Sequence, residues 1–272
     1  MSTAFPVHVR ALGPKDGAPL VLLHGFLGHG GNWKETAALL APHGVRVLAP
    51  DLPGHGDTAF PDGLDWPGAV RLLDAALSEQ APPPWHLGGY SLGGRLALQW
   101  ALDFPEHVLS LTLESCAPGI ADGRERAERR AADDALAARL DQMDANGESR
   151  AAFLRAWYSL PLFSSLAERP ALFQRVIRDR LAAWPNAPGA ALRAFGRGVQ
   201  PPLWDALPQV TASALLLTGE GDARHAETLR EMASSMADAA VELLPDCGHA
   251  AHLEAPAAFA EKVAAFVCRH RA

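Results

Sequence analysis

Residues 89–94 read Gly-Tyr-Ser-Leu-Gly-Gly, and this stretch decides the fold of the 272-residue chain. It follows an apolar run that begins at Trp85, and it opens a helical run that ends at Phe104. A serine in the pattern Gly-x-Ser-x-Gly between a strand and a helix is typical of a nucleophile elbow, a tight turn that exposes the hydroxyl. Backbone N–H groups at the helix start favour negative charge there. Ser91 is therefore the candidate catalytic hydroxyl.

Strand-like apolar runs alternate with helical patterns on both sides of this turn. Uninterrupted apolar strands that alternate with helices predict a parallel sheet covered on both faces. The fold class is therefore α/β, with a mostly parallel, doubly wound sheet and right-handed crossovers. The predicted strands are residues 19–24, 45–50, 85–89, 108–115, 214–218 and 241–245.

A helical region interrupts this alternation, because residues 120–207 contain helical patterns and no strand pattern. An insertion in the middle of a doubly wound sheet lies over the carboxyl ends of the strands, where ligands bind. The sequence predicts a core formed by residues 1–119 and 208–272, with a helical cap, or lid, at residues 120–207. The helical patterns of the cap cover residues 122–146, 148–158, 170–183 and 188–198.

A serine hydroxyl needs a histidine to take its proton and an acid to orient that histidine. In this fold class the chain order is nucleophile, acid, histidine. Asp222 lies in a Gly-rich turn after a late apolar run, and His249 lies in the turn after the last strand. Alone, Asp222 could be a turn former and His249 a cap or core histidine. The three elements in this order favour a triad, with Asp222 preferred to the neighbouring Glu220 because it lies later in the turn.

Two backbone N–H groups are needed to stabilise an oxyanion. Leu92 supplies one at the start of the helix, and Phe26 supplies the other in the loop after the first predicted strand. His24 and His55 are interpreted as histidines that brace loops. Together with His29 they form no zinc signature, so we expect no metal and no cofactor.

Arg95 lies one helical turn after Ser91 on the same face, near the expected floor of a pocket. Two interpretations remain open: a partly buried arginine paired with an acid, or a clamp for an anion, since guanidinium binds carboxylate bidentately. Arg129 belongs to a run, residues 124–134, that mixes arginines with acids. Such a run is typical of a solvated helix face.

Composition limits the possible partners. The net charge is −7 and the basic residues form no long tract, so a nucleic-acid partner is not expected. No run of about 18 apolar residues exists to cross a membrane. The first ten residues lack the layout of a signal peptide, and Cys116, Cys247 and Cys268 lack metal spacing. We expect a cytoplasmic protein with reduced thiols, and the oligomeric state stays open.

Taken together, these residues resemble the α/β-hydrolase superfamily over nearly the whole chain. Within it they are similar to the 2-succinyl-6-hydroxy-2,4-cyclohexadiene-1-carboxylate (SHCHC) synthases of menaquinone biosynthesis. The resemblance implies a helical cap inserted after the sixth strand of the sheet. It is carried by residues 24–28, 33, 51–56, 89–95, 118–120, 126–129, 133, 157–158, 161–163, 200–201, 203, 219–222 and 248–252.

The resemblance implies a carbon–oxygen lyase that eliminates pyruvate from a succinyl-cyclohexene carboxylate. Ser91 would act with His249 as a base on a carbon activated by the succinyl ketone, instead of forming an acyl-enzyme. The ketone oxygen would become enolate-like between the N–H groups of Phe26 and Leu92.

The resemblance also implies a small anionic carboxylate as substrate. Arg95 and Arg129 would hold its carboxylates, Trp157 would line the pocket from the cap, and Tyr90 would join the substrate-binding residues. Arg224 stands where the family often has lysine, which leaves its role open.

Other functions stay open beside the lyase. The same triad could serve a hydrolase, either a carboxylesterase or a hydrolase of carbon–carbon bonds. The chain could also be a non-catalytic ligand-binding module, which the intact triad disfavours. Buried arginines distinguish the lyase, because an esterase of neutral substrates has no need of them.

Overall fold

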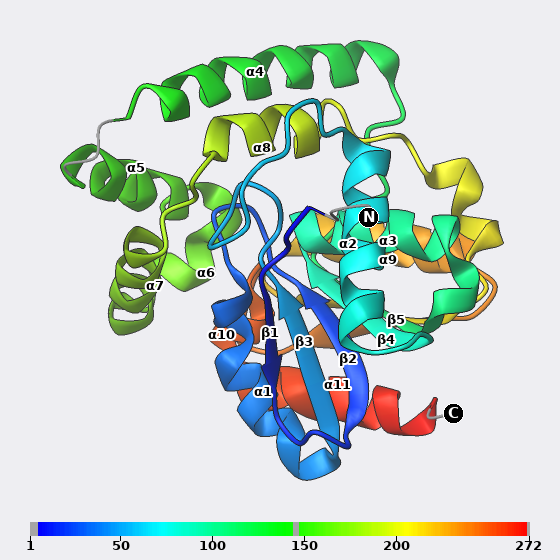
Figure 1. Ribbon diagram of the computed structural model, residues 1–272. Coiled ribbons are helices and arrows are strands. Elements are labelled where there is room, and N and C mark those ends of the chain that lie inside the picture. Colours follow the sequence, from blue (N-terminus) through cyan, green and yellow to red (C-terminus); the bar gives the residue numbers. More distant parts are fainter. Residues whose placement is uncertain (1–4, 144–146, 271–272) are drawn as a thin grey trace.

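The computed structural model describes residues 5–143 and 147–270. Within them, strands form one sheet in the order β1-β3-β2-β4-β5-β6-β7, and only the β1–β3 pair is antiparallel. The predicted mostly parallel sheet is thereby confirmed (Figure 1). The strands are β1 (Val9–Leu12), β2 (Ala18–Leu23), β3 (Val45–Pro50), β4 (Trp85–Tyr90), β5 (Val108–Glu114), β6 (Ser213–Gly219) and β7 (Ala239–Leu244).

Helices cover both faces of this sheet, as predicted for a doubly wound fold. Successive side chains of a strand point to opposite faces. In β2, Leu20 and Leu22 therefore belong to a core that two helices cover, while Val21 and Leu23 belong to the core on the other face, which three helices cover. The pair is α1 (Lys34–Leu40) and α11 (Pro256–Arg269), and the three are α2 (Trp66–Gln80), α3 (Leu92–Asp103) and α9 (Ala223–Ser235).

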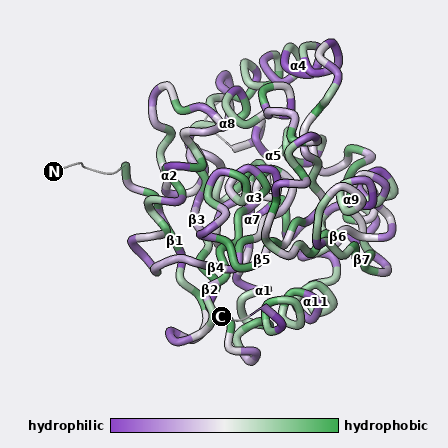
Figure 2. The backbone as a smooth tube through the Cα atoms, turned by 90° about the vertical axis from the view of Figure 1, so that its right-hand side faces the viewer, coloured by the Kyte–Doolittle hydropathy of each residue, from purple (hydrophilic) through white to green (hydrophobic). Residues whose placement is uncertain are grey.

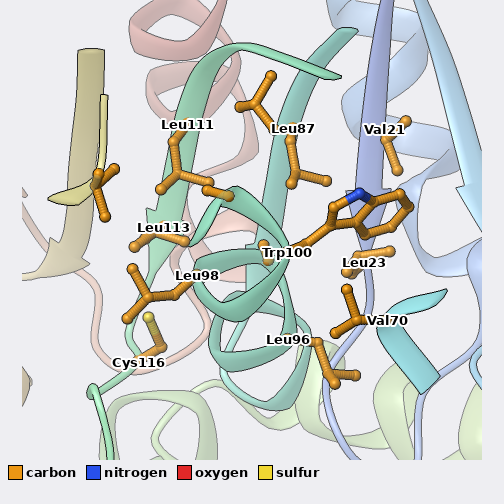
Figure 3. Packing of buried hydrophobic residues seen from close by; sticks show 14 of the residues in the cluster. Val21, Leu23, Val70, Leu87, Leu96, Leu98, Trp100, Leu111, Leu113 and Cys116 are labelled. Carbon is orange, nitrogen blue, oxygen red and sulfur yellow. The ribbon is translucent and has the colours of Figure 1, made fainter. Parts of the chain in front are cut away.

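Helix α3 is fixed at the centre of the larger core. Its Trp100 lies beside Val21 and Leu23 of β2, and its Leu96 lies beside Val70 of α2 (Figure 3). Each of these side chains is fully buried. Close packing of this kind holds a helix in one position. The first residue of α3, which directly follows Ser91, is therefore held rigidly against the sheet.

The insertion between β5 and β6 is helical, and it carries its own small core. Leu140, Leu154, Ile177 and Leu192 come from different cap helices and pack together with Leu27, from the loop after β2. Helix α4 lies along α8 at one end of the sheet (Figure 1). The cap helices are α4 (Gly123–Asp141), α5 (Glu148–Tyr158), α6 (Ser164–Ala167), α7 (Pro170–Ala182) and α8 (Pro188–Phe195).

The place of the insertion in the strand order differs from the expectation. In the described part of the chain it follows the fifth strand and not the sixth, because β1 is the single strand there that precedes β2. The helix predicted over residues 122–146 ends at Asp141, and residues 144–146 lie outside the described ranges. None of the described helices is long and apolar enough to cross a membrane.

Most of α4 faces solvent. Its buried residues are Asp133, Ala137 and Leu140, and hydrophilic residues follow much of its length (Figure 2). The mixed charge run is therefore a solvated helix face, as its pattern predicts. Arg129 lies one turn before Asp133, so it is one of the residues of this run that can turn towards the core.

Candidate active site

Ser91 occupies a strained turn between β4 and α3. Its φ is 51° and its ψ is −107°, a conformation that residues other than glycine rarely adopt. Only glycines fit two positions before and two positions after Ser91: a Cβ on Gly89 would collide with the backbone of Gly93, and one on Gly93 would collide with the carbonyl of Leu23. This is the geometry that a nucleophile elbow requires, and it leaves the serine hydroxyl facing a cavity.

Asp222 and His249 meet at the same edge of the sheet. Asp222 follows β6 and His249 follows β7, and His249 Nδ1 lies 2.7 Å from Asp222 Oδ2. Burial favours protonation of Asp222, but hydrogen bonds from His225 and His249 outweigh it and hold the pKa of Asp222 well below its usual range. Asp222 therefore stays ionised and orients the imidazole of His249.

The other nitrogen of this imidazole is free to react. His249 Nε2 is buried and has no hydrogen-bond partner in residues 5–143 and 147–270. A buried polar atom without a partner costs about 1–3 kcal/mol. His249 and Ser91 line the same cavity, so this nitrogen is available to take a proton from the serine or from a bound substrate.

We expect kcat/KM to rise with pH through one ionisation below pH 6.5 and then to level off. His249 accepts a proton only when its Nε2 is unprotonated, and burial lowers its pKa from the ordinary 6.5. Protonation should therefore inactivate the enzyme only in more acidic solution. The measurement is the initial rate from about pH 4.5 to 8 with a neutral substrate that does not titrate in this range. An acidic limb centred above pH 6.5 would contradict the role given to His249.

A cavity of about 250 Å³ collects nearly all the predicted site residues. The backbone N–H groups of Phe26 and Leu92, at its wall, donate to no group in the described residues, as an oxyanion site requires. Trp157 lines the cavity from α5, and its ring lies 5.7 Å from that of Phe26. The cavity is lined by Phe26, Ser91, Leu92, Arg95, Arg129, Trp157, Leu162, Ala191, Leu192, Phe195, Gly196, Arg197, Arg224, His225 and His249.

Tyr90 is the exception among the predicted substrate-binding residues. It does not line the cavity, and its side chain is buried against the rings of His249 and His252, at centroid distances of 5.3 and 4.7 Å. The reason is the alternation of side chains along β4, which directs Tyr90 into the smaller core. In this structure Tyr90 supports His249 from behind.

Arg95 is nearly buried, with 8% of its surface exposed, and it has no acidic partner within the described ranges. Its Nη1 donates to Gln200 Oε1 at 3.1 Å, and its guanidinium lies 5.4 Å from the ring centre of Trp66. Burial, with the nearby charges of Arg197 and Arg129, lowers the pKa of Arg95 to about 9. The described residues therefore include no acid that would pair with Arg95, as the first interpretation of this arginine requires. A bound anion would offset the cost of this buried charge.

Arg129 differs from Arg95 because it has an acidic neighbour. Its Nε lies 2.8 Å from Asp133 Oδ1, and Asp133 Oδ2 accepts the N–H of Gly198 at 3.1 Å. Asp133 thus ties α4 to the segment after α8. This contact directs Arg129 towards the cavity that it lines together with Arg95.

Among the titratable residues of this cavity, sequence reasoning missed Arg197 and His225. Arg197 lies just after α8, and its position between two glycines was the only signal for it. His225 lies three residues after Asp222, in the first turn of α9. Its Nδ1 is 3.0 Å and its backbone N–H 3.2 Å from Asp222 Oδ1. His225 therefore helps to fix the carboxylate that orients His249.

His24 and His55 brace loops, as interpreted from the sequence. His24 Nε2 accepts the N–H of Leu52 at 2.9 Å, and the two imidazole rings are 5.1 Å apart. Burial lowers the pKa of both, which keeps them neutral. Among the described residues, potential metal-binding atoms converge at Asp222, His225 and His249, and at His8, Asp51 and Asp57.

Comparison with known proteins extends over nearly the whole chain. Residues 20–262 match a family model described as the alpha/beta hydrolase family. The chain is 33% identical to 2-succinyl-6-hydroxy-2,4-cyclohexadiene-1-carboxylate synthase of Salmonella paratyphi A over 261 residues. The aligned residues cover 95% of this chain and 97% of the relative. The solved structure of MenH from S. aureus has a TM-score of 0.88 at 30% identity, over 97% of this chain and 98% of the other.

A second solved structure shows how widely the fold is shared. A thermophilic esterase from Thermogutta terrifontis, with malate bound, has a TM-score of 0.81 at 24% identity, over 97% of this chain and 94% of the other. The overall fold of this chain is therefore similar to that of MenH and to that of an esterase, so the fold alone does not decide the activity.

Proposed function

We propose that this chain, which belongs to the α/β-hydrolase family, is a carbon–oxygen lyase that eliminates pyruvate from a succinyl-cyclohexene carboxylate. The relative from Salmonella paratyphi A carries the name of the enzyme with this activity, SHCHC synthase. The observation that carries the proposal is Arg95, a buried guanidinium without an acidic partner in the described residues, in the same cavity as Ser91 and His249. A cavity built in this way suits a substrate with carboxylates.

The reaction would begin with removal of a proton from a carbon activated by the succinyl ketone. Ser91 Oγ accepts this proton as it passes its own to His249 Nε2, and Asp222 stabilises the imidazolium that forms. The electron pair of the broken C–H bond moves onto the ketone oxygen. The N–H groups of Phe26 and Leu92 stabilise that oxygen.

The second step breaks the carbon–oxygen bond to the enolpyruvyl group. The electron pair returns from the enolate oxygen to form a ring double bond, and the leaving oxygen departs with the electrons of the C–O bond. A proton from the imidazolium of His249 then completes the conversion of the enolate of pyruvate to pyruvate. Arg95 and Arg129 hold carboxylates through these steps, and Trp157 excludes water from the cap side.

Hydrolysis of esters is the second candidate, and the elbow supports it. The strained Ser91 would serve acyl transfer equally well, as would the N–H groups of Phe26 and Leu92, which donate to no described residue. A hydrolase of carbon–carbon bonds would use the same groups. A ligand-binding module without catalysis has no need of the Asp222–His249 contact, so that alternative is disfavoured.

Two measurements on the wild-type enzyme test the lyase proposal. We expect pyruvate release from the succinyl-cyclohexene substrate, and rapid-quench mass spectrometry during turnover should find no accumulated adduct on Ser91. Intact protein mass before mixing is the control. A substantial serine adduct with the same substrate, or turnover of esters without any pyruvate release, would favour the hydrolase. Slow hydrolysis of activated esters is compatible with both mechanisms.

A further inference from the structure

Two cavities meet beside the triad and share a wall. The second cavity, of about 350 Å³, lies between the segment that follows β5 and the start of α9. Ala117, Gly119 and Trp204 contribute to its lining. Arg197, Arg224 and His225 line both cavities, so these three side chains form the junction between them.

The junction carries positive charge without matching acids. Neither Arg197 nor Arg224 makes an ion pair or a side-chain hydrogen bond within the described residues. Burial lowers the pKa of Arg197, and the charges of Arg129 and Arg224 lower it further. Like charges held this close repel one another unless an anion lies between them. Of the four arginines that line the main cavity, Arg129 alone has a described acid within ion-pair distance.

The acids around the junction do not satisfy these two cations. Asp133 is occupied by Arg129 and by the N–H of Gly198. Asp122 caps α4 by accepting the N–H of Glu125 at 2.7 Å. Glu125 raises the pKa of Arg197 but is exposed and outside ion-pair distance.

The backbone on either side of Arg197 is held by hydrogen bonds, whereas Arg224 is an exposed residue at the start of α9. Gly196 donates its N–H to the carbonyl of Leu192 at 2.8 Å, and Gly198 donates to Asp133, so the residue between them is anchored on either side. Arg224 lies in the first turn of α9, two residues after the triad aspartate. A planar guanidinium loses little entropy for each hydrogen bond that it forms to a carboxylate.

We propose that Arg197 and Arg224 form a second anion subsite, which binds a carboxylate of the substrate remote from the reacting carbon; this inference rests on the proposed function. Arg95 lies in the main cavity and takes a different carboxylate. The second cavity receives the part of the substrate next to the remote carboxylate. The substrate class is therefore a polycarboxylate that extends across the junction, and Arg197 contributes to the selection of such substrates over monocarboxylates.

The test compares Arg197→Met and Arg224→Met with a matched control, Arg230→Met, which removes an exposed arginine from the same helix as Arg224. Binding of succinate and of propionate to each protein is measured by titration calorimetry at constant ionic strength. We expect the wild type to bind succinate, and each junction variant to bind it about tenfold more weakly. Propionate binding should change by less than about twofold, and Arg197→Lys should restore part of the loss. The control should match the wild type.

Activity separates this inference from the proposed function. For pyruvate release, kcat/KM of Arg197→Met should fall about tenfold, with the same melting temperature as the wild type. Wild-type affinity for succinate in Arg197→Met, or no succinate binding by the wild type, would overturn the subsite even if pyruvate is released. Weakened succinate binding together with no pyruvate release by the wild type would support the subsite and overturn the lyase.

Discussion

Replacing Ser91 with alanine is expected to lower kcat for pyruvate release by at least about 10³-fold while the protein stays folded. In the proposed mechanism the hydroxyl passes the proton between the substrate and His249, so its loss would remove the base together with its relay. Alanine deletes one oxygen from a partly exposed side chain and leaves Gly89 and Gly93 in place. The measurement is steady-state turnover, with the melting temperature and circular dichroism spectrum as controls for folding.

The same experiment on His249 shows whether the two residues act as a unit. His249→Ala should cause a loss of similar size, and the Ser91→Ala/His249→Ala double variant should be little worse than either single variant. Losses that multiply in the double variant would mean that the residues act independently. Retention of most activity by Ser91→Ala would remove the elbow from the mechanism altogether.

The sequence predicts those parts of the fold that a run of apolar residues marks clearly. The central strands are continuous apolar runs, since both of their faces are covered, and the triad residues occupy turns at the ends of such runs. β1 gives no such signal, because it has four residues, lies at the sheet edge and is only partly buried. Its place is set by pairing with β3 and by the contact of Arg10 with Asp51 at 2.6 Å, both of which join distant parts of the chain.

Residues of the candidate site can be predicted where the spacing within one helix or strand decides which way a side chain points. Arg95 follows Ser91 by one helical turn, so its approach to the cavity could be read from spacing. Tyr90 does not line the cavity, because adjacency to Ser91 in sequence does not decide which face of β4 a side chain takes. Arg197 joins the site only because the cap folds back over the sheet, and no local pattern reports such a contact.

Replacement of Arg95 or Arg129, which line the main cavity, gives the second large expected effect. Arg95→Ala and Arg129→Ala should each lower kcat/KM for the anionic substrate by roughly 2–4 kcal/mol, the loss of a charge-assisted hydrogen bond in a desolvated site. Activity on a neutral p-nitrophenyl ester should fall much less. Arg95→Lys should recover only part of the loss, because lysine keeps the charge but not the bidentate fork.

A loss of activity in these variants shows binding of an anion only if it comes from the lost charge and not from lost packing of the arginine side chain. Arg95 also covers the ring of Trp66 and donates to Gln200, so Arg95→Met, which keeps an apolar stem over the ring, is the matched variant. For Arg129, the partner variant is Arg129→Ala/Asp133→Asn, which avoids leaving an unpaired acid beside the cavity. We expect both to lose activity on the anionic substrate at near wild-type melting temperature. Equal losses on neutral and anionic substrates, with a lowered melting temperature, would make Arg95 a structural residue. The main physical reason to prefer a lyase of carboxylates over an esterase would then be gone.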